Sequence, residues 1–158
     1  MAKPAPDERV RRSLAMNRRA RHEYEILDEL ECGIVLRGTE LKSLRGKGAT
    51  IEQAFGHFRG NELWLVNAHI AEYAMGNIHN HVPDRDRKLL AHRRELLRWV
   101  ARVREKGITI VPLELYFDSA LVKVRMALVR GKKMHDKRET KRAQDAKRDI
   151  DRAMSRRR

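Results

Sequence analysis

The chain has 158 residues and a net charge of +14 at pH 7, and 41% of its residues are hydrophobic but only 5% are aromatic. This length suits one domain with a modest, mainly aliphatic core. The single cysteine, Cys32, excludes an internal disulfide framework, and no apolar run is long enough for a transmembrane helix or a signal segment. We therefore expect a soluble, cytoplasmic protein.

The positive charge is concentrated at the two ends of the chain. Residues 1–21 carry seven Lys/Arg against two Asp/Glu, and residues 130–158 carry thirteen against five, whereas residues 22–129 hold sixteen against fifteen. Crowded cationic side chains repel each other unless an anionic partner compensates them. Nucleic acid is the commonest such partner, because binding releases its counterions. An anionic membrane surface is the alternative.

The first third of the chain predicts a flexible arm, strands and a short helix. Residues 1–16 contain two prolines and little hydrophobic periodicity, so we expect a disordered basic N-terminal arm. Apolar residues in 24–36 predict two short strands with a bend at Gly33. Residues 39–45 predict a short helix with Thr39 as its N-cap.

The middle of the chain predicts a hairpin, a loop and a long helix. Residues 55–58 and 63–66 flank the turn Gly60-Asn61, which is typical of a β-hairpin. Residues 71–85 are rich in Gly, Asn and Pro and predict a loop. Leucines and valines at helical spacing predict one long helix over residues 86–106.

Two further strands, 108–117 and 122–128, are predicted on either side of a turn at 118–120. Small β proteins avoid open edges by closing into barrels. The fold class that we expect is therefore mainly β: a small closed barrel over residues 17–130, with one longer and one short helix.

The last segment, 131–158, has a different composition. Its few apolar residues share a thin helical face, which consists of Ala143, Ala146, Ile150 and Met154. This face is too small to offset the entropy that ordering costs. We expect a basic tail that is disordered when free and helical on a partner.

Several segments agree, in order and spacing, with one bacterial family. They are Asn17 to Tyr24, Glu31 to Arg45, Gly76-Asn77 with Asn80-His81, Arg85 to Leu90, and Gly131-Lys132-Lys133 with Asp136-Lys137-Arg138. Together they resemble the SsrA-binding proteins, the small protein B family. Leu41, where the family often has valine, and the turn Asp118-Ser119-Ala120 are small departures.

The resemblance implies an OB-type barrel, a shape that binds oligonucleotides on a strand face and the neighbouring loops. It implies binding of transfer-messenger RNA (SsrA RNA) and its delivery to stalled ribosomes for trans-translation. The barrel would hold the transfer-RNA-like part of this RNA. The tail would contact small-subunit RNA at the decoding centre and read the empty mRNA channel.

On this resemblance and on their chemistry we predict RNA-binding residues in the barrel. A carboxylate accepts hydrogen bonds from base amino groups, leucine and imidazole pack on unstacked bases, and cations meet phosphates. The alternative is a core leucine and solvated charges. The predicted residues are Asn17, Arg18, Arg19, Arg21, Glu31, Lys42, Arg85, Arg87, Lys88, Leu90 and His92.

A second set is predicted to contact the decoding site and the mRNA channel. Glycine permits close approach to RNA, lysines meet phosphates, and a histidine stacks on a base. The alternative is an ordinary linker followed by a tail with incidental hydrophobic residues. The set is Gly131, Lys132, Lys133, His135, Asp136, Lys137, Arg138, Ile150 and Met154.

No catalytic chemistry competes with this interpretation. His69, His79 and His81 lack the cysteines or clustered carboxylates of a metal site. Ser43 and Cys32 lie in no nucleophile motif. We predict a non-enzyme without metal, cofactor, small-molecule substrate or membrane partner. The alternatives are a general single-strand RNA-binding protein, a metal-dependent nuclease that uses acidic residues such as Asp84 and Asp86, and a protein whose tail binds membrane surfaces.

Overall fold

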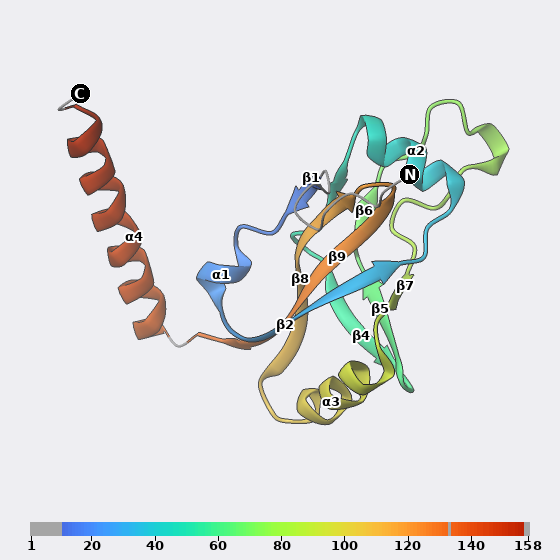
Figure 1. Cartoon of the computed structure of the whole chain (residues 1–158). Helices are drawn as coiled ribbons and strands as arrows, with labels where there is room; N and C mark the ends of the chain where they lie inside the picture. The colour runs from blue at the N-terminus through green and yellow to red at the C-terminus, as the bar shows by residue number, and fades with distance from the viewer. Residues whose placement is uncertain (1–10, 133, 157–158) are drawn as a thin grey trace, which may run out of the picture.

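The computed structural model describes residues 11–132 and 134–156 (Figure 1). Its strands and helices follow each other along the chain as β1 (Arg11–Met16), α1 (Ala20–Glu23), β2 (Tyr24–Ile34), α2 (Gly38–Gly46), β3 (Ala49–Thr50), β4 (Phe55–Arg59), β5 (Glu62–Val66), β6 (His69–Ile70), the 3-10 turn η2 (Asn77–His79), β7 (Arg87–Leu90), α3 (Arg93–Val103), β8 (Ile108–Asp118), β9 (Leu121–Gly131) and α4 (Met134–Ser155). The chain is mainly β, as predicted.

The main sheet closes on itself. Its strand order is β1-β8-β4-β5-β7-β2-β9, and β9 also pairs with β8, so the strands from β8 to β9 form a ring and β1 lies outside it on β8. The pairs are antiparallel. At the contact between β4 and β8, Gly56 lies opposite Ile110. A Cβ at Gly56 would lie 2.6 Å from the Ile110 Cγ2 atom, so glycine is needed there. The predicted barrel is confirmed.

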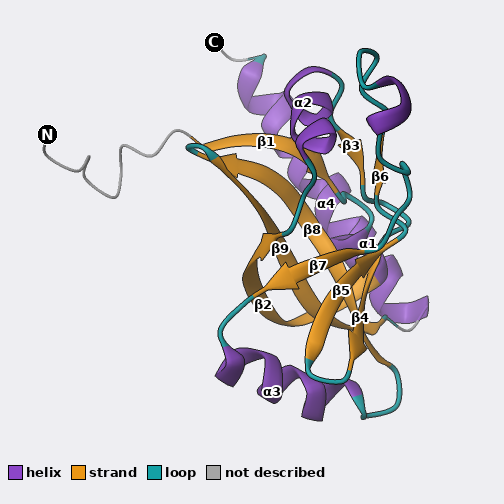
Figure 2. Ribbon diagram, turned by 90° about the vertical axis from the view of Figure 1, so that its right-hand side faces the viewer, coloured by secondary structure: helices purple, strands orange, loops and turns teal. Residues whose placement is uncertain are grey.

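The interior of the ring is apolar, and a helix covers each end. Helix α3 lies across one end and α2 lies near the other (Figure 2). Trp99 of α3 is fully buried, and its indole N–H donates to Asp28 Oδ2 at 2.9 Å. The core is built mainly from Leu30, Cys32, Leu63, Leu65, Leu89, Ile110, Leu115, Val124, Met126 and Leu128. A rigid barrel therefore supports the side chains on its outer surface.

Three predictions for the first third of the chain need correction. Residues 11–16 form β1 on β8 and are not a disordered arm; residues 1–10 lie outside the described residues. Strand β2 continues through Gly33 because β9 pairs with nearly its whole length. Its bulge lies between Ile26 and Asp28. Helix α2 has Arg37 as its N-cap. Thr39 is not the cap, because the helix already begins at Gly38, and its hydroxyl is instead hydrogen-bonded to His81 Nδ1 at 2.9 Å.

The middle of the chain confirms some predictions and corrects one. The hairpin β4–β5, the loop near residue 80 and the strand pair β8–β9 are as predicted. The long helix over 86–106 is wrong, because residues 87–90 form strand β7 and α3 covers only 93–103. The apolar pattern of this segment fits both structures, and pairing of β7 with β2 and β5 closes the barrel.

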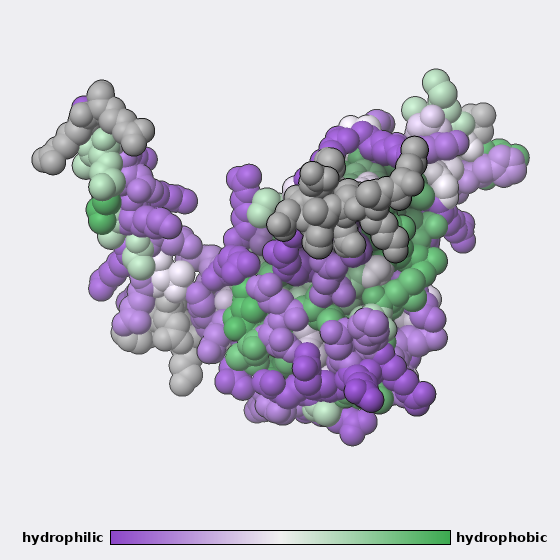
Figure 3. Space-filling view, in the orientation of Figure 1, coloured by the Kyte–Doolittle hydropathy of each residue, from purple (hydrophilic) through white to green (hydrophobic). Residues whose placement is uncertain are grey.

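The tail is helical in the structure. Helix α4 stands apart from the barrel (Figure 1), and its surface is largely hydrophilic with hydrophobic residues toward its far end (Figure 3). This helix is the form that we expect on a partner. The structure thus shows no disorder at 134–155, and disorder of the free tail stays a prediction. None of the helices in the described part of the chain has the length and apolarity that crossing a bilayer requires.

Candidate nucleic-acid interface

Three of the predicted RNA-binding residues meet in one surface hollow of about 400 Å³. Glu31 comes from β2, Leu90 ends β7, and His92 precedes α3. The strand pairing that places Gly33 opposite Leu90 brings the three segments together. The hollow is lined by Glu31, Cys32, Gly33, Leu90, Ala91, His92, Glu95 and Lys123. We refer to it below as the Glu31 hollow.

Glu31 is an oriented carboxylate that still faces solvent. Its Oε2 accepts a hydrogen bond from the Tyr116 hydroxyl, and its Oε1 accepts one from Lys123 Nζ at 2.9 Å. These two hydrogen bonds hold the pKa of Glu31 below its ordinary value. The side chain is 50% exposed, so the ionised group remains available to a donor on RNA.

Leu90 and His92 give the hollow an apolar and an imidazole surface. Leu90 is 51% exposed although β7 is part of the barrel, because its side chain points outward. His92 is exposed and makes no side-chain capping hydrogen bond to α3. The hollow adjoins a groove lined by further apolar side chains, among them Leu36, Leu41 and Leu121. An exposed leucine beside an oriented carboxylate suits an unstacked base.

Arg87 is not an RNA-contacting residue in this structure, which corrects the sequence prediction. Its side chain is fully buried. The guanidinium lies 3.3 Å from Glu40 Oε1 and donates to the carbonyls of Ala68 at 2.7 Å, Pro83 at 2.9 Å and Arg85 at 3.1 Å. All of its donor groups therefore face the protein interior, and its role is structural.

Glu40 is the centre of this buried ion cluster. Arg85 donates to it from Nε at 2.5 Å and from Nη2 at 2.9 Å. Burial would raise the pKa of Glu40, but the hydrogen bonds from Arg85 and the Arg37 amide outweigh burial and hold the pKa below its ordinary value. The Arg85 side chain is only 21% exposed, so the main role of Arg85 is also structural: it neutralises Glu40.

The remaining basic candidates lie in separate places. Lys88 is half-exposed and pairs with Glu62 at 3.0 Å. Lys42, on α2, lies over the Tyr73 ring at 5.5 Å. Neither residue lines the Glu31 hollow. The structure therefore does not gather the predicted cations into one patch.

The residues around α1 form a second group. Arg18, Arg19 and Arg21 are exposed, and Arg21 lies 3.5 Å from Glu29. Asn17 is only 7% exposed, and its Nδ2 donates to the Pro112 carbonyl at 3.0 Å. This group lies at the start of β2, seven residues before Glu31, which is roughly 20 Å along a strand.

The tail begins beside this second group. Gly131 pairs with Tyr24, and the Lys132 ammonium donates to the Arg21 carbonyl and to Thr140 Oγ1, each at 3.0 Å. Lys133 and the side chains of His135, Asp136 and Lys137 lie outside the described residues. The described members on α4 are exposed, and they are Arg138, Ile150 and Met154.

Sequence reasoning missed Lys123, Tyr116 and Leu121. Lys123 and Tyr116 hold the Glu31 carboxylate, and Leu121 extends the apolar groove beside Leu90. The alternation of charged and apolar residues along 121–128 indicates which side chains point outward. It does not reveal that Lys123 lies opposite Gly33, because that register is set by pairing across about 90 residues of chain.

Two of the three histidines considered for a metal site, His69 and His81, have other partners. His69 Nδ1 lies 2.8 Å from Asp84 Oδ1, and buried His81 is hydrogen-bonded to Thr39 and to the Ile70 carbonyl. Within residues 11–132 and 134–156, no group of three or more His, Cys, Asp or Glu side chains could hold a metal ion. Asp86 forms an ion pair with Arg59.

A closed barrel of short antiparallel strands, with a solvent-open hollow on its wall and a protruding basic helix, defines a class of small β-barrel binding modules. Residues 14–156 match the family model described as SmpB protein. This chain belongs to the SmpB family. The resemblance inferred from the sequence is confirmed.

The relatives match over nearly their whole lengths. The chain is 49% identical to the SsrA-binding protein of Pelotomaculum thermopropionicum, over 89% of this chain and 92% of the relative. It is 48% identical to that of Desulforamulus reducens, over 98% and 96%, and 50% identical to that of Kineococcus radiotolerans, over 96% and 97%. A solved chain described under "tmRNA-SmpB: a journey to the center of the bacterial ribosome" is 48% identical, with a TM-score of 0.63 over 75% of this chain and 84% of that chain.

Proposed function

We propose that this chain binds transfer-messenger RNA (SsrA RNA) and delivers it to stalled ribosomes for trans-translation. Family membership supports the proposal, as do relatives about half identical that are named SsrA-binding proteins. A solved relative described with tmRNA and the bacterial ribosome supports the ribosomal partner. The chain acts by recognition in the cytoplasm and catalyses no reaction.

The observation that carries the proposal is the convergence of Glu31, Leu90, His92 and Lys123 on one hollow. The ionised Glu31 carboxylate accepts a hydrogen bond from a base amino group or a ribose hydroxyl. Leu90 and the His92 ring pack against an unstacked base, and the Lys123 ammonium neutralises a nearby phosphate. Such a site binds bases that leave the helical stack, as they do in the loops of a folded RNA.

The tail carries the second half of the function. It enters the decoding site and the vacant mRNA channel, where its cations contact ribosomal RNA phosphates and Ile150 and Met154 provide the apolar face. A helix of 22 residues is about 33 Å long, so α4 can follow a channel for that distance. Intact messenger occupies the same space, so the tail selects empty channels by competition.

The division of the chain follows from this proposal. Residues 17–130 form the RNA-binding barrel and residues 131–158 the ribosome-directed tail. Residues 1–16, with their basic side chains, lie before the barrel, and β1 attaches the end of this segment to β8. The partners are SsrA RNA and small-subunit RNA, and no metal, cofactor or small-molecule substrate takes part.

Competition binding tests RNA recognition directly. Labelled SsrA RNA is bound to the purified chain at moderate salt and displaced by unlabelled SsrA RNA or by bulk single-stranded RNA. The proposal predicts that SsrA RNA competes far better. If both competitors displace the probe equally well, the chain is a general single-strand RNA-binding protein. RNA cleavage that a chelator abolishes would instead indicate a nuclease.

Truncation tests the division between barrel and tail. A chain that ends at Arg130 should keep most of its affinity for SsrA RNA but lose peptide tagging on stalled ribosomes. An equal loss of binding and tagging would contradict the division. Binding of the isolated tail to anionic vesicles as tightly as to ribosomes would favour the membrane alternative.

A further inference from the structure

One of the two side chains that hold the Glu31 carboxylate is out of reach of RNA. Tyr116, on β8, is 1% exposed and is not among the residues that line the Glu31 hollow. Its hydroxyl donates a hydrogen bond to Glu31 Oε2. Lys123, by contrast, lines the hollow, and its side chain is 23% exposed. Beyond its packing in the barrel, Tyr116 can therefore affect RNA binding only through Glu31.

The Tyr116 hydroxyl restricts the orientation of Glu31. An exposed glutamate samples several rotamers, and fixing one of them costs conformational entropy when RNA binds. Lys123 orients Glu31 less strictly, because its ammonium, on a flexible stem, lies 2.9 Å from Glu31 Oε1 and also 2.9 Å from Asp118 Oδ2. The buried Tyr116 ring has a fixed position. Burial and the neighbouring carboxylate raise the pKa of Tyr116, so its hydroxyl keeps the proton that it donates.

Strand β1 completes this arrangement from outside the ring of strands. It pairs with β8, where Ser13 lies opposite Tyr116. The Arg11 guanidinium lies over the Tyr116 ring, 3.9 Å from its centroid, and its Nη2 donates to Glu114 at 3.2 Å. A cation over an aromatic face is attracted to the ring. The positive charge of Arg11 also opposes the rise in the pKa of Tyr116, which makes the hydroxyl a stronger donor to Glu31.

The remaining charged groups near Glu31 have other positions or partners. Arg125 lies opposite Glu31 on β9. Its guanidinium lies within 4.0 Å of two other carboxylates, those of Glu29 and Glu114. Each Glu31 oxygen has two lone pairs, so the carboxylate can accept from RNA while its present donors stay in place. The other charged or titratable groups around it are His92 and Glu95, which line the hollow, and Asp118 and Lys123.

We propose that Tyr116 and Arg11 are positioning residues for RNA recognition: Tyr116 fixes the Glu31 carboxylate in the orientation that RNA meets, and Arg11 fixes Tyr116. The inference rests on the RNA-binding function proposed above. It makes β1 part of the RNA site, although none of its residues lines the Glu31 hollow.

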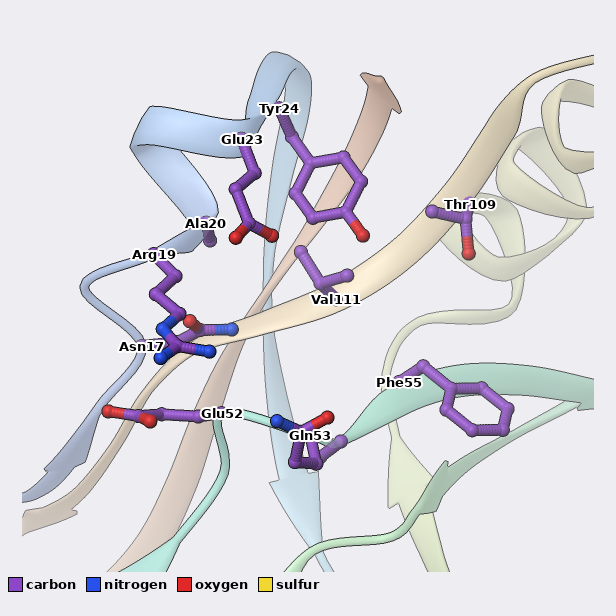
Figure 4. A pocket seen from close by; sticks show the side chains of 11 residues that line it. Asn17, Arg19, Ala20, Glu23, Tyr24, Glu52, Gln53, Phe55, Thr109 and Val111 are labelled. Carbon is purple, nitrogen blue, oxygen red and sulfur yellow. The ribbon is translucent and has the colours of Figure 1, made fainter. Parts of the chain in front are cut away.

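A double-mutant cycle with SsrA RNA tests the role of Tyr116. Titrations at moderate salt compare the full-length wild type with Tyr116→Phe, Glu31→Ala and the double variant, after thermal melting has shown which variants are folded. Tyr116→Phe should weaken binding about fivefold, the effect of one hydrogen bond to a charged group, but less than about 1.5-fold when Glu31 is already alanine. The matched control is Tyr24→Phe, which removes a hydroxyl from a ring that lines a separate cavity with Thr109 and Val111 (Figure 4). It should bind like the wild type.

The dependence of affinity on salt tests the role of Arg11. Arg11→Ala should weaken binding about threefold and leave this dependence unchanged, whereas each lost phosphate contact lowers its slope by about 0.7–0.9. The control Arg12→Ala removes the same charge from the next position of β1, where the side chain lines a hollow beside Arg45. A lower slope for Arg11→Ala would show that Arg11 contacts phosphate itself, and an equal loss for Arg12→Ala at unchanged slope would show a general effect of β1. Either result overturns the positioning role of Arg11.

The carboxyl carbon of Glu31, followed by NMR during a pH titration of the free chain, reports the contact without RNA. The pKa of Glu31 should rise toward its ordinary 4.5 in Tyr116→Phe and stay unchanged in Tyr24→Phe. An unchanged value in Tyr116→Phe overturns the inference, and so does a Tyr116→Phe loss of affinity that persists in full without Glu31. Both results leave the proposed function intact. If Tyr116→Phe does not fold, Arg11→Ala still decides whether β1 acts through the ring. A wild-type chain that does not bind SsrA RNA overturns the proposed function and this inference together.

Discussion

Replacing Arg87 by methionine separates a structural role from an RNA contact. Arg87→Met keeps a side chain of similar length but removes the guanidinium. The change leaves the Ala68 and Pro83 carbonyls without their present donors, and it leaves Glu40 with Arg85 as its one guanidinium partner.

The cost can be worked out from this geometry. Removing one partner of a buried ion pair lowers the free energy of unfolding by about 3–5 kcal/mol. Arg85 still neutralises Glu40, so the loss should lie near the lower end, about 3 kcal/mol. At roughly 2–4 °C per kcal/mol for a chain of this size, the melting temperature should fall by roughly 6–12 °C.

Thermal and urea unfolding of Arg87→Met and of a neighbouring control measure this loss. Lys88→Met removes a cation one residue away, whose partner Glu62 is half-exposed, and it should cost under about 1 kcal/mol. The reasoning is refuted if Arg87→Met melts like the wild type and yet loses RNA affinity, because Arg87 would then face the RNA.

Three further predictions concern single side chains. Leu90→Ala should weaken SsrA RNA binding by about 1 kcal/mol, roughly fivefold in a titration, because the half-exposed leucine has about half of its surface left for RNA to cover; unchanged affinity would remove Leu90 from the interface. Glu40 has a folded-state pKa below its ordinary 4.5, so its stabilising contribution is complete above that pH and is lost as pH falls through the folded-state value. Urea midpoints between about pH 6 and about pH 3 should therefore fall more steeply for the wild type than for Glu40→Gln, and parallel slopes would contradict this. Burial raises the pKa of the Cys32 thiol to about 12, so a thiol reagent at about pH 8 should label the chain only after unfolding, and rapid labelling of the folded chain would argue against this burial.

The elements that were predicted correctly have local signals. Gly60-Asn61 between two apolar runs is sufficient for the hairpin β4–β5, and β-branched alternation around residues 118–120 is sufficient for β8 and β9. The helix over 86–106 failed because Leu89 fits an apolar helix face as well as an inward strand position. Only contacts with Leu63 on β5 and Ile34 on β2 decide between the two.

The candidate interface was less predictable than the fold. Glu31, Leu90 and His92 were named from a resemblance, but their meeting in one hollow depends on strand register, which the sequence does not display. Charge alone misled at Arg87, which sequence cannot distinguish from the exposed arginines because its buried partner, Glu40, lies 47 residues away. The burial of Arg87 depends on how the whole barrel closes around it, which no local stretch of sequence displays.

The central claim is that the Glu31 hollow receives SsrA RNA, and crosslinking in living cells tests it most directly. A photoreactive benzophenone side chain is placed at position 92, in the hollow, or at position 57, which is exposed on β4 away from it. The RNA joined to each chain after irradiation is sequenced. SsrA RNA should dominate at position 92 and be scarce at position 57. Equal mixtures of bulk RNA at both positions, or no RNA at position 92, would contradict the claim.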